Sequence, residues 1–576
     1  MRLVPTLRKI QPHPLTFLSG ILLTLVFDPW NLSFLMWIAL IPWFEALDRT
    51  KTRKGAFIQG MWMCFFMSIG AFSWIASVLH QYAGLPWVLG LLGLMLFGLI
   101  GQPQFTLFAI VHREIQALLQ SRNFSEARGS ASKLMLLGIA LAAAYTGLDW
   151  VLPKLFVDSL GHAFYQWENL RQIADLGGVH LITFLIYLVN YALWDLLSRL
   201  RKRTEPSAWP ALKTSAPFLI MALLLCYASV RYGVMRNEEI HALTDKAPRK
   251  IQIAAVQANI GDFDKVASES GVRGAAEKIL HTFYDLSDDA LKLKPRPQVL
   301  IWPETSYPST FRTPSNSDEF ARDQQLERFV QSRKTPLLFG GYDQFEHRDF
   351  NAFFFLSPRP LPYLGGGPGS NPGSGSGSSD LQIYRKSILL LFGEYIPGAD
   401  RFPWIKRAFP MVGNFGRGPG PQILKIPVLD PQGNIDGEPI LANPVICYEA
   451  LYPQFVIDAV RKGSRLIVNI TNDSWFGDYG EPVLHLSLTV FRSIETRTPQ
   501  IRSTNTGITT LILPDGSMPQ QTKLFVPEIL NVAVPILAPV STLMLRWGDW
   551  FGFAALCFGF FVLSFYWVHV LRSRRS

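Results

Sequence analysis

The sequence predicts two parts of different kinds: a multi-pass α-helical membrane domain with eight spans, and an α/β domain that lies outside the cytoplasm. Aromatic residues make up 13% of the 576 residues and charged residues only 17%. Most apolar residues gather in long runs, which is typical of membrane proteins. One long segment departs from this pattern. From about residue 249, short β-branched runs alternate with polar helical stretches, which indicates an α/β domain.

The membrane part is predicted from eight apolar runs, because about 20 apolar residues are needed to cross the hydrocarbon core as a helix. Lys and Arg gather in every second connection. "DRTKTRKG" follows the second run, whereas "HQYAGLPW" between the third and fourth runs carries neither residue. By the positive-inside rule, both termini are expected in the cytoplasm. The runs cover roughly 12–28, 31–48, 55–79, 86–111, 133–156, 178–198, 213–232 and 548–571.

These patterns predict three segments: seven spans in 1–232, an extracytoplasmic α/β domain in 233–546, and the eighth span with a cytoplasmic tail in 547–576. Within the middle segment, "RKIQIAAVQANIG", "PQVLIWPE" and "SRLIVNITND" are expected strands, and "VLHLSLTVFRSIETRT" is an expected helix. Mostly apolar strands predict sheets that are buried on both faces. The Gly/Ser/Pro-rich stretch 363–380 is expected to be a flexible surface loop.

Composition also excludes several classes of function. The net charge of +10 does not predict a nucleic-acid partner, because the Lys and Arg residues flank apolar runs and do not form one basic face. Three of the four cysteines lie inside apolar runs, which excludes a disulfide framework. The sequence contains no Walker loop, zinc-type cysteine spacing or dinucleotide fingerprint, so no metal or nucleotide cofactor is expected.

Three polar residues stand at the ends of expected strands: Glu304 after "VLIWP", Lys386 in "QIYRKSILLLFGEYIP", and Cys447 after "NPVI". A carboxylate in a partly apolar setting can take the proton of a thiol, and a lysine ammonium can stabilise the oxyanion that forms when the thiolate attacks a carbonyl. The three residues thus form a coherent acyl-transfer set. Taken singly, each also fits an ordinary role: Cys447 as a small core residue, Glu304 as a helix cap or surface turn, and Lys386 as a solvated charge.

The surrounding residues favour the acyl-transfer interpretation. "WPETSYP", "YRKSILLLFGEYIP", "VICYEALYP" and "VNITNDSWFGD" resemble the Glu–Lys–Cys signatures of the nitrilase superfamily and, more closely, those of the apolipoprotein N-acyltransferase family. "IADLGGVHLITFLIYLVN", "IRSTNTGITTLILPDG" and "TLMLRWGDW" extend the resemblance over nearly the whole chain. The resemblance implies a nitrilase-like α-β-β-α sandwich on the periplasmic side of the bacterial cytoplasmic (inner) membrane.

The resemblance also implies the activity. A phospholipid acyl donor would acylate Cys447, and the thioester would pass its acyl chain to the N-terminal amine of diacylglyceryl-cysteine on an apolipoprotein in a ping-pong cycle. By similarity, Cys447 is the nucleophile, Glu304 the general base and acid, and Lys386 the oxyanion stabiliser. The partners are then a phospholipid, a diacylated apolipoprotein and membrane lipid.

Four further residues match the family near these three: Glu394 in "FGEYIP", Tyr448 and Glu449 beside the cysteine, and Trp302 beside the base. Glu394 is expected to orient Lys386 or to help deprotonate the amine. Packing or support of the neighbouring residues is the alternative for all four. His485 in "PVLHLSL" is expected to pack in a helix and not to take part in catalysis.

Other functions are compatible with part of this pattern. A membrane-tethered nitrilase-like amidase would share the three residues and release its thioester to water. A catalytically silent lipid-binding scaffold would tolerate loss of any of the three, yet all are present. A transporter is disfavoured because the apolar runs carry few internal charges and show no inverted repeat.

Overall fold

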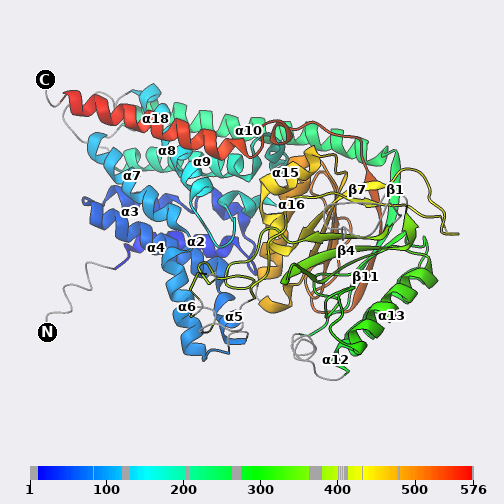
Figure 1. The fold of residues 1–576 in the computed structure, drawn as a ribbon. Helices are drawn as coiled ribbons and strands as arrows, with labels where there is room; N and C mark the ends of the chain where they lie inside the picture. The colour runs from blue at the N-terminus through cyan, green and yellow to red at the C-terminus, as the bar shows by residue number, and fades with distance from the viewer. Residues whose placement is uncertain are drawn as a thin grey trace. The chain divides into compact units, whose positions relative to one another are not determined.

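The computed structural model describes residues 11–81, 84–119, 130–202, 207–261, 274–361, 379–399, 401–402, 404, 407, 413–430, 432–477 and 480–573 (Figure 1). The chain divides into two compact units. One comprises Met1–Asn237 and Asp549–Ser576, and the other Glu238–Gly548. The first is called the membrane unit and the second the α/β unit. Nearly all of the predicted Gly/Ser loop lies outside the described residues, and its last two residues, Ser379 and Asp380, belong to a strand.

The membrane unit is helical. Its α-helices are α2 (Pro14–Val26), α3 (Ile41–Asp48), α4 (Arg53–Phe72), α5 (Ile75–Gln81), α6 (Trp87–Ile100), α7 (Pro103–Leu119), α8 (Ala131–Val151), α9 (Ala174–Lys202), α10 (Trp209–Asp245) and α18 (Trp550–Ser573). Large apolar side chains on α6, α10 and α18 are exposed, as expected of lipid-facing helices.

The expectation of eight regular spanning helices is wrong. Among the described residues, six helical segments are long and apolar enough to cross a membrane. The run 12–28 forms only the 13 residues of α2, which is shorter than a span requires. The run 31–48 is broken into the 3-10 turn Ser33–Trp37 and the short helix α3, whose first turn holds Pro42. A proline there cannot continue a helix from the preceding residues, because it lacks an N–H and its ring crowds the previous turn. The six segments are Arg53–Phe72, Trp87–Leu118, Ala131–Val151, Leu170–Lys202, Trp209–Asp245 and Trp550–Val568.

The last helix, α18, packs closely against α8 although the two are far apart in the sequence. A Cβ atom on Gly147 of α8 would lie 2.4 Å from the Cα atom of Leu556 in α18. In the same way, a Cβ atom on Gly559 would lie 2.6 Å from the backbone nitrogen of Ala144. Small residues allow such close approach of helix backbones in membranes, where packing replaces the hydrophobic effect.

The α/β unit contains two sheets in the part of the chain that is described. The strand order is β11-β1-β2-β3-β4-β5 in one and β10-β9-β8-β7-β6 in the other. The strands are β1 (Arg249–Gln257), β2 (Val299–Ile301), β3 (Leu337–Phe345), β4 (Arg348–Leu361), β5 (Ser379–Arg385), β6 (Leu424–Ile426), β7 (Ile440–Ile446), β8 (Leu466–Thr471), β9 (Gln500–Thr504), β10 (Thr510–Ile512) and β11 (Glu528–Ile536).

Helices cover the outer faces of the sheets, which confirms the predicted α/β sandwich (Figure 1). Residues of α12 (Ala275–Lys292) and α13 (Ser317–Arg333) share a buried apolar core with the first sheet. On the second sheet, α15 (Pro453–Arg461) packs over β7 and β8, and α16 (Glu481–Thr496) packs beside α15. Helix α13 and strand β11 were not predicted from the sequence.

Candidate active site

Three strands bring the predicted acyl-transfer residues to their positions. Glu304 follows β2, Lys386 comes directly after β5, and Cys447 comes directly after β7. All three side chains are buried. The Lys386 Nζ atom lies 3.2 Å from Glu304 Oε1 and 2.9 Å from Glu394 Oε1. Lys386 therefore lies between two carboxylates, one that follows β2 and one in the loop eight residues after the lysine.

The charges of this cluster act on one another. Burial opposes the charged form of Lys386, but the carboxylates of Glu304 and Glu394 outweigh it and raise the lysine pKa. Burial and then the Glu304 carboxylate raise the pKa of the Cys447 thiol, whereas Lys386 lowers it. The cysteine therefore lies within the field of both residues. Its thiol carries its proton until a base removes it.

The Cys447 backbone has an unusual conformation. Its φ angle is 49°, in the left-handed region that a non-glycine residue adopts at a cost of about 1–2 kcal/mol. It is the first residue of the 3-10 turn Cys447–Leu451, so strand β7 changes direction at this position. Strained residues of this kind gather at functional sites, where the surrounding structure maintains them.

Asn351 belongs to the same cluster, and sequence reasoning missed it. Its Nδ2 atom donates to Glu304 Oε1 at 2.7 Å and to Glu394 Oε1 at 2.8 Å. Asn351 lies on β4, and its carbonyl accepts the N–H of Lys386 on the neighbouring chain segment. The available signal was a single amide at the start of the apolar run "NAFFFLSP". Asn351 and Lys386 together hold the two carboxylates in place.

Glu449 ties the loop after Lys386 to the turn after Cys447. Its buried carboxylate accepts hydrogen bonds from the backbone N–H groups of Ser387 (2.6 Å), Ile388 (3.1 Å) and Ile446 (2.9 Å). The Tyr384 hydroxyl donates to the same carboxylate at 2.6 Å. These contacts connect segments that are about 60 residues apart, so they align the lysine with the cysteine.

The remaining predicted neighbours make packing contacts. Trp302 is fully buried, donates its indole N–H to Ser287 Oγ at 2.8 Å and stacks on Phe283. Tyr448 accepts a hydrogen bond from the Tyr452 hydroxyl at 3.1 Å, with the two rings edge to face. Such contacts are those expected under the packing alternative for these two residues.

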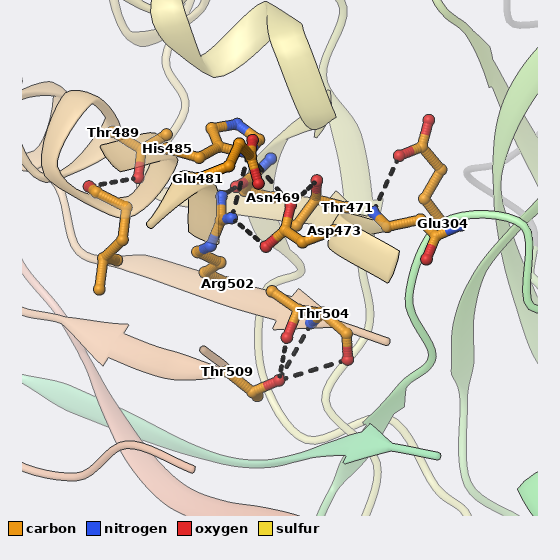
Figure 2. A network of polar contacts seen from close by, with 12 residues as sticks. Glu304, Asn469, Thr471, Asp473, Glu481, His485, Thr489, Arg502, Thr504 and Thr509 are labelled. Carbon is orange, nitrogen blue, oxygen red and sulfur yellow. Dashed lines mark hydrogen bonds and ion pairs between the residues drawn. The ribbon is translucent and has the colours of Figure 1, made fainter. Parts of the chain in front are cut away.

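His485 does more than pack in its helix. Its Nδ1 atom lies 3.1 Å from Asp473 Oδ1, and Arg502 Nη2 lies 2.8 Å from Asp473 Oδ2 (Figure 2). The ligand atoms of Asp473, Glu481 and His485 lie within 4.8 Å of one another, as in many metal sites. Opposite Asp473, however, the positive charge is already supplied by the Arg502 guanidinium, so these residues do not need a cation to balance the carboxylate.

Comparison with known proteins finds relatives over most of the chain. Residues 19–192 match the family model for the apolipoprotein N-acyltransferase N-terminal domain, and residues 252–536 match the carbon-nitrogen hydrolase family. Apolipoprotein N-acyltransferase from Bdellovibrio bacteriovorus is 31% identical over 92% of this chain and 90% of its own length. The one from Geobacter metallireducens is 30% identical over 95% of this chain and 93% of its own length.

Among solved structures, a mutant of the amidase from Nesterenkonia sp. AN1 covers 50% of this chain and 91% of its own, with 14% identity and a TM-score of 0.33. The two bacterial acyltransferases align with a larger share of this chain than the amidase does, and the aligned share includes residues of both units. The chain therefore belongs to the apolipoprotein N-acyltransferase family.

Proposed function

We propose that this protein transfers a fatty acyl chain from a phospholipid to the N-terminal amine of diacylglyceryl-cysteine on apolipoproteins, the last step of bacterial lipoprotein maturation. Relatives named apolipoprotein N-acyltransferase, which align with 92% and 95% of the chain, support lipoprotein N-acylation as the activity. The single observation that carries the chemistry is the buried pair of Lys386 and Glu304, 3.2 Å apart, whose charges both act on Cys447.

In the first half of the cycle, Glu304 takes the thiol proton and the Cys447 sulfur attacks the ester carbonyl of the phospholipid. An ammonium group has three donors. In the described part of the chain, the Lys386 ammonium donates one hydrogen bond to Glu304 and one to Glu394. Its third N–H is then left for the developing oxyanion. The ester bond then breaks, and the lysophospholipid leaves as an alcohol with the proton that Glu304 returns.

In the second half, the α-amine of the apolipoprotein attacks the thioester carbonyl. Glu304 accepts a proton from the amine, the carbon–sulfur bond breaks, and the thiol regains a proton as the amide forms. The Glu394 side chain contacts Lys386 and Asn351, and its second oxygen accepts the N–H of Leu390 at 2.8 Å. These contacts support a role for Glu394 in orienting the lysine.

The same proposal places the α/β unit on the periplasmic side and both termini in the cytoplasm. Lys and Arg gather in "DRTKTRKG" before the first of the six candidate spans, and in "LRSRRS" after the last. Six crossings, like eight, leave the two ends on one side and the segment before the last crossing on the other. The smaller number of spans therefore does not change the proposed orientation.

Intact mass of the purified protein, measured after incubation with a phospholipid, tests the function. We expect an added acyl mass on the wild type and on Cys557→Ser, a control that removes a different thiol, but none on Cys447→Ser. Adding a diacylated lipopeptide should then remove the adduct and lengthen the lipopeptide by one acyl chain. A tethered amidase would instead lose its adduct to water alone, and absence of any adduct on the wild type would exclude the thioester.

A further inference from the structure

A buried polar network lies behind the nucleophile, on the second sheet and on α16. Arg502 on β9 donates to Asn469 Oδ1 at 3.0 Å and to Asp473 Oδ2 at 2.8 Å. His485 Nδ1 on α16 lies 3.1 Å from Asp473 Oδ1 and 3.3 Å from Arg502 Nη2. Figure 2 shows the Arg502 and His485 side chains converging on Asp473. Asp473 and Arg502 are fully buried.

The segment from Thr471 to Asp473 links this network to both reacting groups. The parallel pairing of β7 with β8 places Ile446 opposite Ile470, so the next residues, Cys447 and Thr471, are neighbours. Burial and the Glu304 charge raise the pKa of the Cys447 thiol, and Thr471 lowers it. The Thr471 hydroxyl donates to Asp473 Oδ1 at 3.2 Å. The backbone N–H of Asn472 donates to Glu304 Oε2 at 3.1 Å.

We propose that Arg502, Asp473 and His485 form an anchor that positions Thr471 and Asn472, and through them sets the distance between the Cys447 thiol and the Glu304 carboxylate. These are positioning residues, because they act through Thr471 and Asn472. The inference rests on the proposed roles of Cys447 and Glu304. It adds to them a means of keeping acid and base in line while two bulky lipid substrates enter in turn.

The charges of the network are consistent with a fixed anchor. Burial opposes ionisation of Asp473, but Arg502 and the hydrogen bond with His485 outweigh it and lower the aspartate pKa. Burial and the Asp473 charge raise the pKa of Glu481, whose side chain lies 3.6 Å from His485. The network therefore pairs the Asp473 carboxylate with the Arg502 guanidinium, and the raised pKa of Glu481 favours its neutral form. Buried charges that are paired and hydrogen-bonded in this way hold a defined geometry.

Thr471 has one hydroxyl proton and two acceptors for it. While Cys447 is a thiol, the hydroxyl can donate to Asp473 and accept the S–H. Once Glu304 has taken the proton, the hydroxyl can rotate and donate to the thiolate. Burial and the Glu304 charge raise the pKa of the Cys447 thiol most, and the negative charge of Asp473 raises it by a smaller amount. If Asp473 acts by positioning, removing its charge should slow acylation of Cys447. If it acted only through its charge, the removal should lower the thiol pKa and accelerate the reactions of Cys447.

The test compares Thr471→Val, Thr471→Ser and Asp473→Asn with Thr489→Val. Thr489 is a buried threonine on α16 whose hydroxyl bonds the Leu486 carbonyl, so it is a matched control. Two rates are measured by mass spectrometry: alkylation of Cys447 by iodoacetamide as a function of pH, and acylation of Cys447 by phospholipid. Melting temperature reports whether each variant is folded.

We expect Thr471→Val to slow acylation at least tenfold and to shift the alkylation profile to higher pH, whereas Thr471→Ser and Thr489→Val stay within about threefold of the wild type. Asp473→Asn should slow acylation at least tenfold without slowing alkylation. The inference is overturned if Thr471→Val behaves like Thr489→Val, or if Asp473→Asn accelerates both reactions. If Asp473→Asn does not fold, the valine and serine variants decide. If the wild type forms no acyl adduct, the proposed function fails, but the alkylation profiles still test the role of Thr471. The two failures can therefore be told apart.

Discussion

At the scale of the residue, burial and hydrogen bonding act in opposite directions on the pKa of Glu449. Burial raises its pKa to about 7, although the Tyr384 hydroxyl and backbone N–H groups donate to it and favour its charged form. The folded protein therefore binds this proton more tightly than the unfolded chain, in which the ordinary value of 4.5 applies. Between these two values, the folded state carries more protons than the unfolded state.

This difference predicts a pH dependence of stability. The contribution of the Glu449 proton is fully present below pH 4.5 and is lost as the pH rises to about 7. At about 1.4 kcal/mol per pKa unit, the loss amounts to about 3 kcal/mol. Melting curves of the purified protein from pH 4.5 to 8 should show that Glu449→Gln removes this slope. Glu438→Gln, at an exposed position, should keep it, and parallel curves for wild type and Glu449→Gln would contradict the assignment.

At the scale of the element, the close contact of α8 with α18 depends on glycine. The atoms nearest to a Cβ on Gly147 include the Cα and backbone nitrogen of Leu556, at 2.4 and 2.6 Å, and backbone cannot move aside as a flexible side chain can. The sequence-distant α18 is thus held to α8 by shape and not by a polar contact at this position. Replacing Gly147 with a larger residue must separate the two helix backbones.

The expected result for Gly147→Val is a loss of about 1–3 kcal/mol of stability, the usual cost of overpacking. Its melting temperature in detergent should fall below that of the wild type by several degrees, on the scale of about 2–4 °C per kcal/mol. Gly261→Val is the matched control, because no atom lies within 4 Å of a Cβ built there. Equal melting temperatures for the two variants would show that the helices can separate without cost.

At the scale of the whole molecule, the orientation of the chain is open to a direct test. Helix α10 has 37 residues and is about 56 Å long at 1.5 Å per residue, whereas the hydrocarbon core is about 30 Å thick. Its last part, "RNEEIHALTD", is polar and therefore extends beyond the hydrocarbon core. The α/β unit begins in this polar part, at Glu238.

The positive-inside arrangement predicts which positions a membrane-impermeant maleimide can reach. We expect Gln331→Cys, at an exposed position of the α/β unit, to be labelled in cells with a permeabilised outer membrane. Lys51→Cys, at an exposed position in the basic connection before α4, should be labelled only after the inner membrane is opened. The wild type with its own four cysteines supplies the background. The reverse pattern would place the α/β unit in the cytoplasm.

Local patterns in the sequence were sufficient for several features of this protein. The division into apolar runs and an α/β segment follows from composition and periodicity, which each stretch carries by itself. Glu304, Lys386 and Cys447 were also predicted to stand at strand ends, and they come after β2, β5 and β7. The predicted strands at "PQVLIWPE" and "SRLIVNITND" were confirmed as β2 and β8.

Only the tertiary structure decided which polar residues meet. Asn351 meets Lys386 because β4 pairs with β5, and it meets Glu304 because β3 alone separates β4 from β2. Arg502 reaches Asp473 because β9 lies beside β8. No local pattern contains these pairings, since they depend on strand order and register. The number of spanning helices was also misjudged from the sequence, because hydropathy measures the length of an apolar run and not whether Pro42 lets it form one helix.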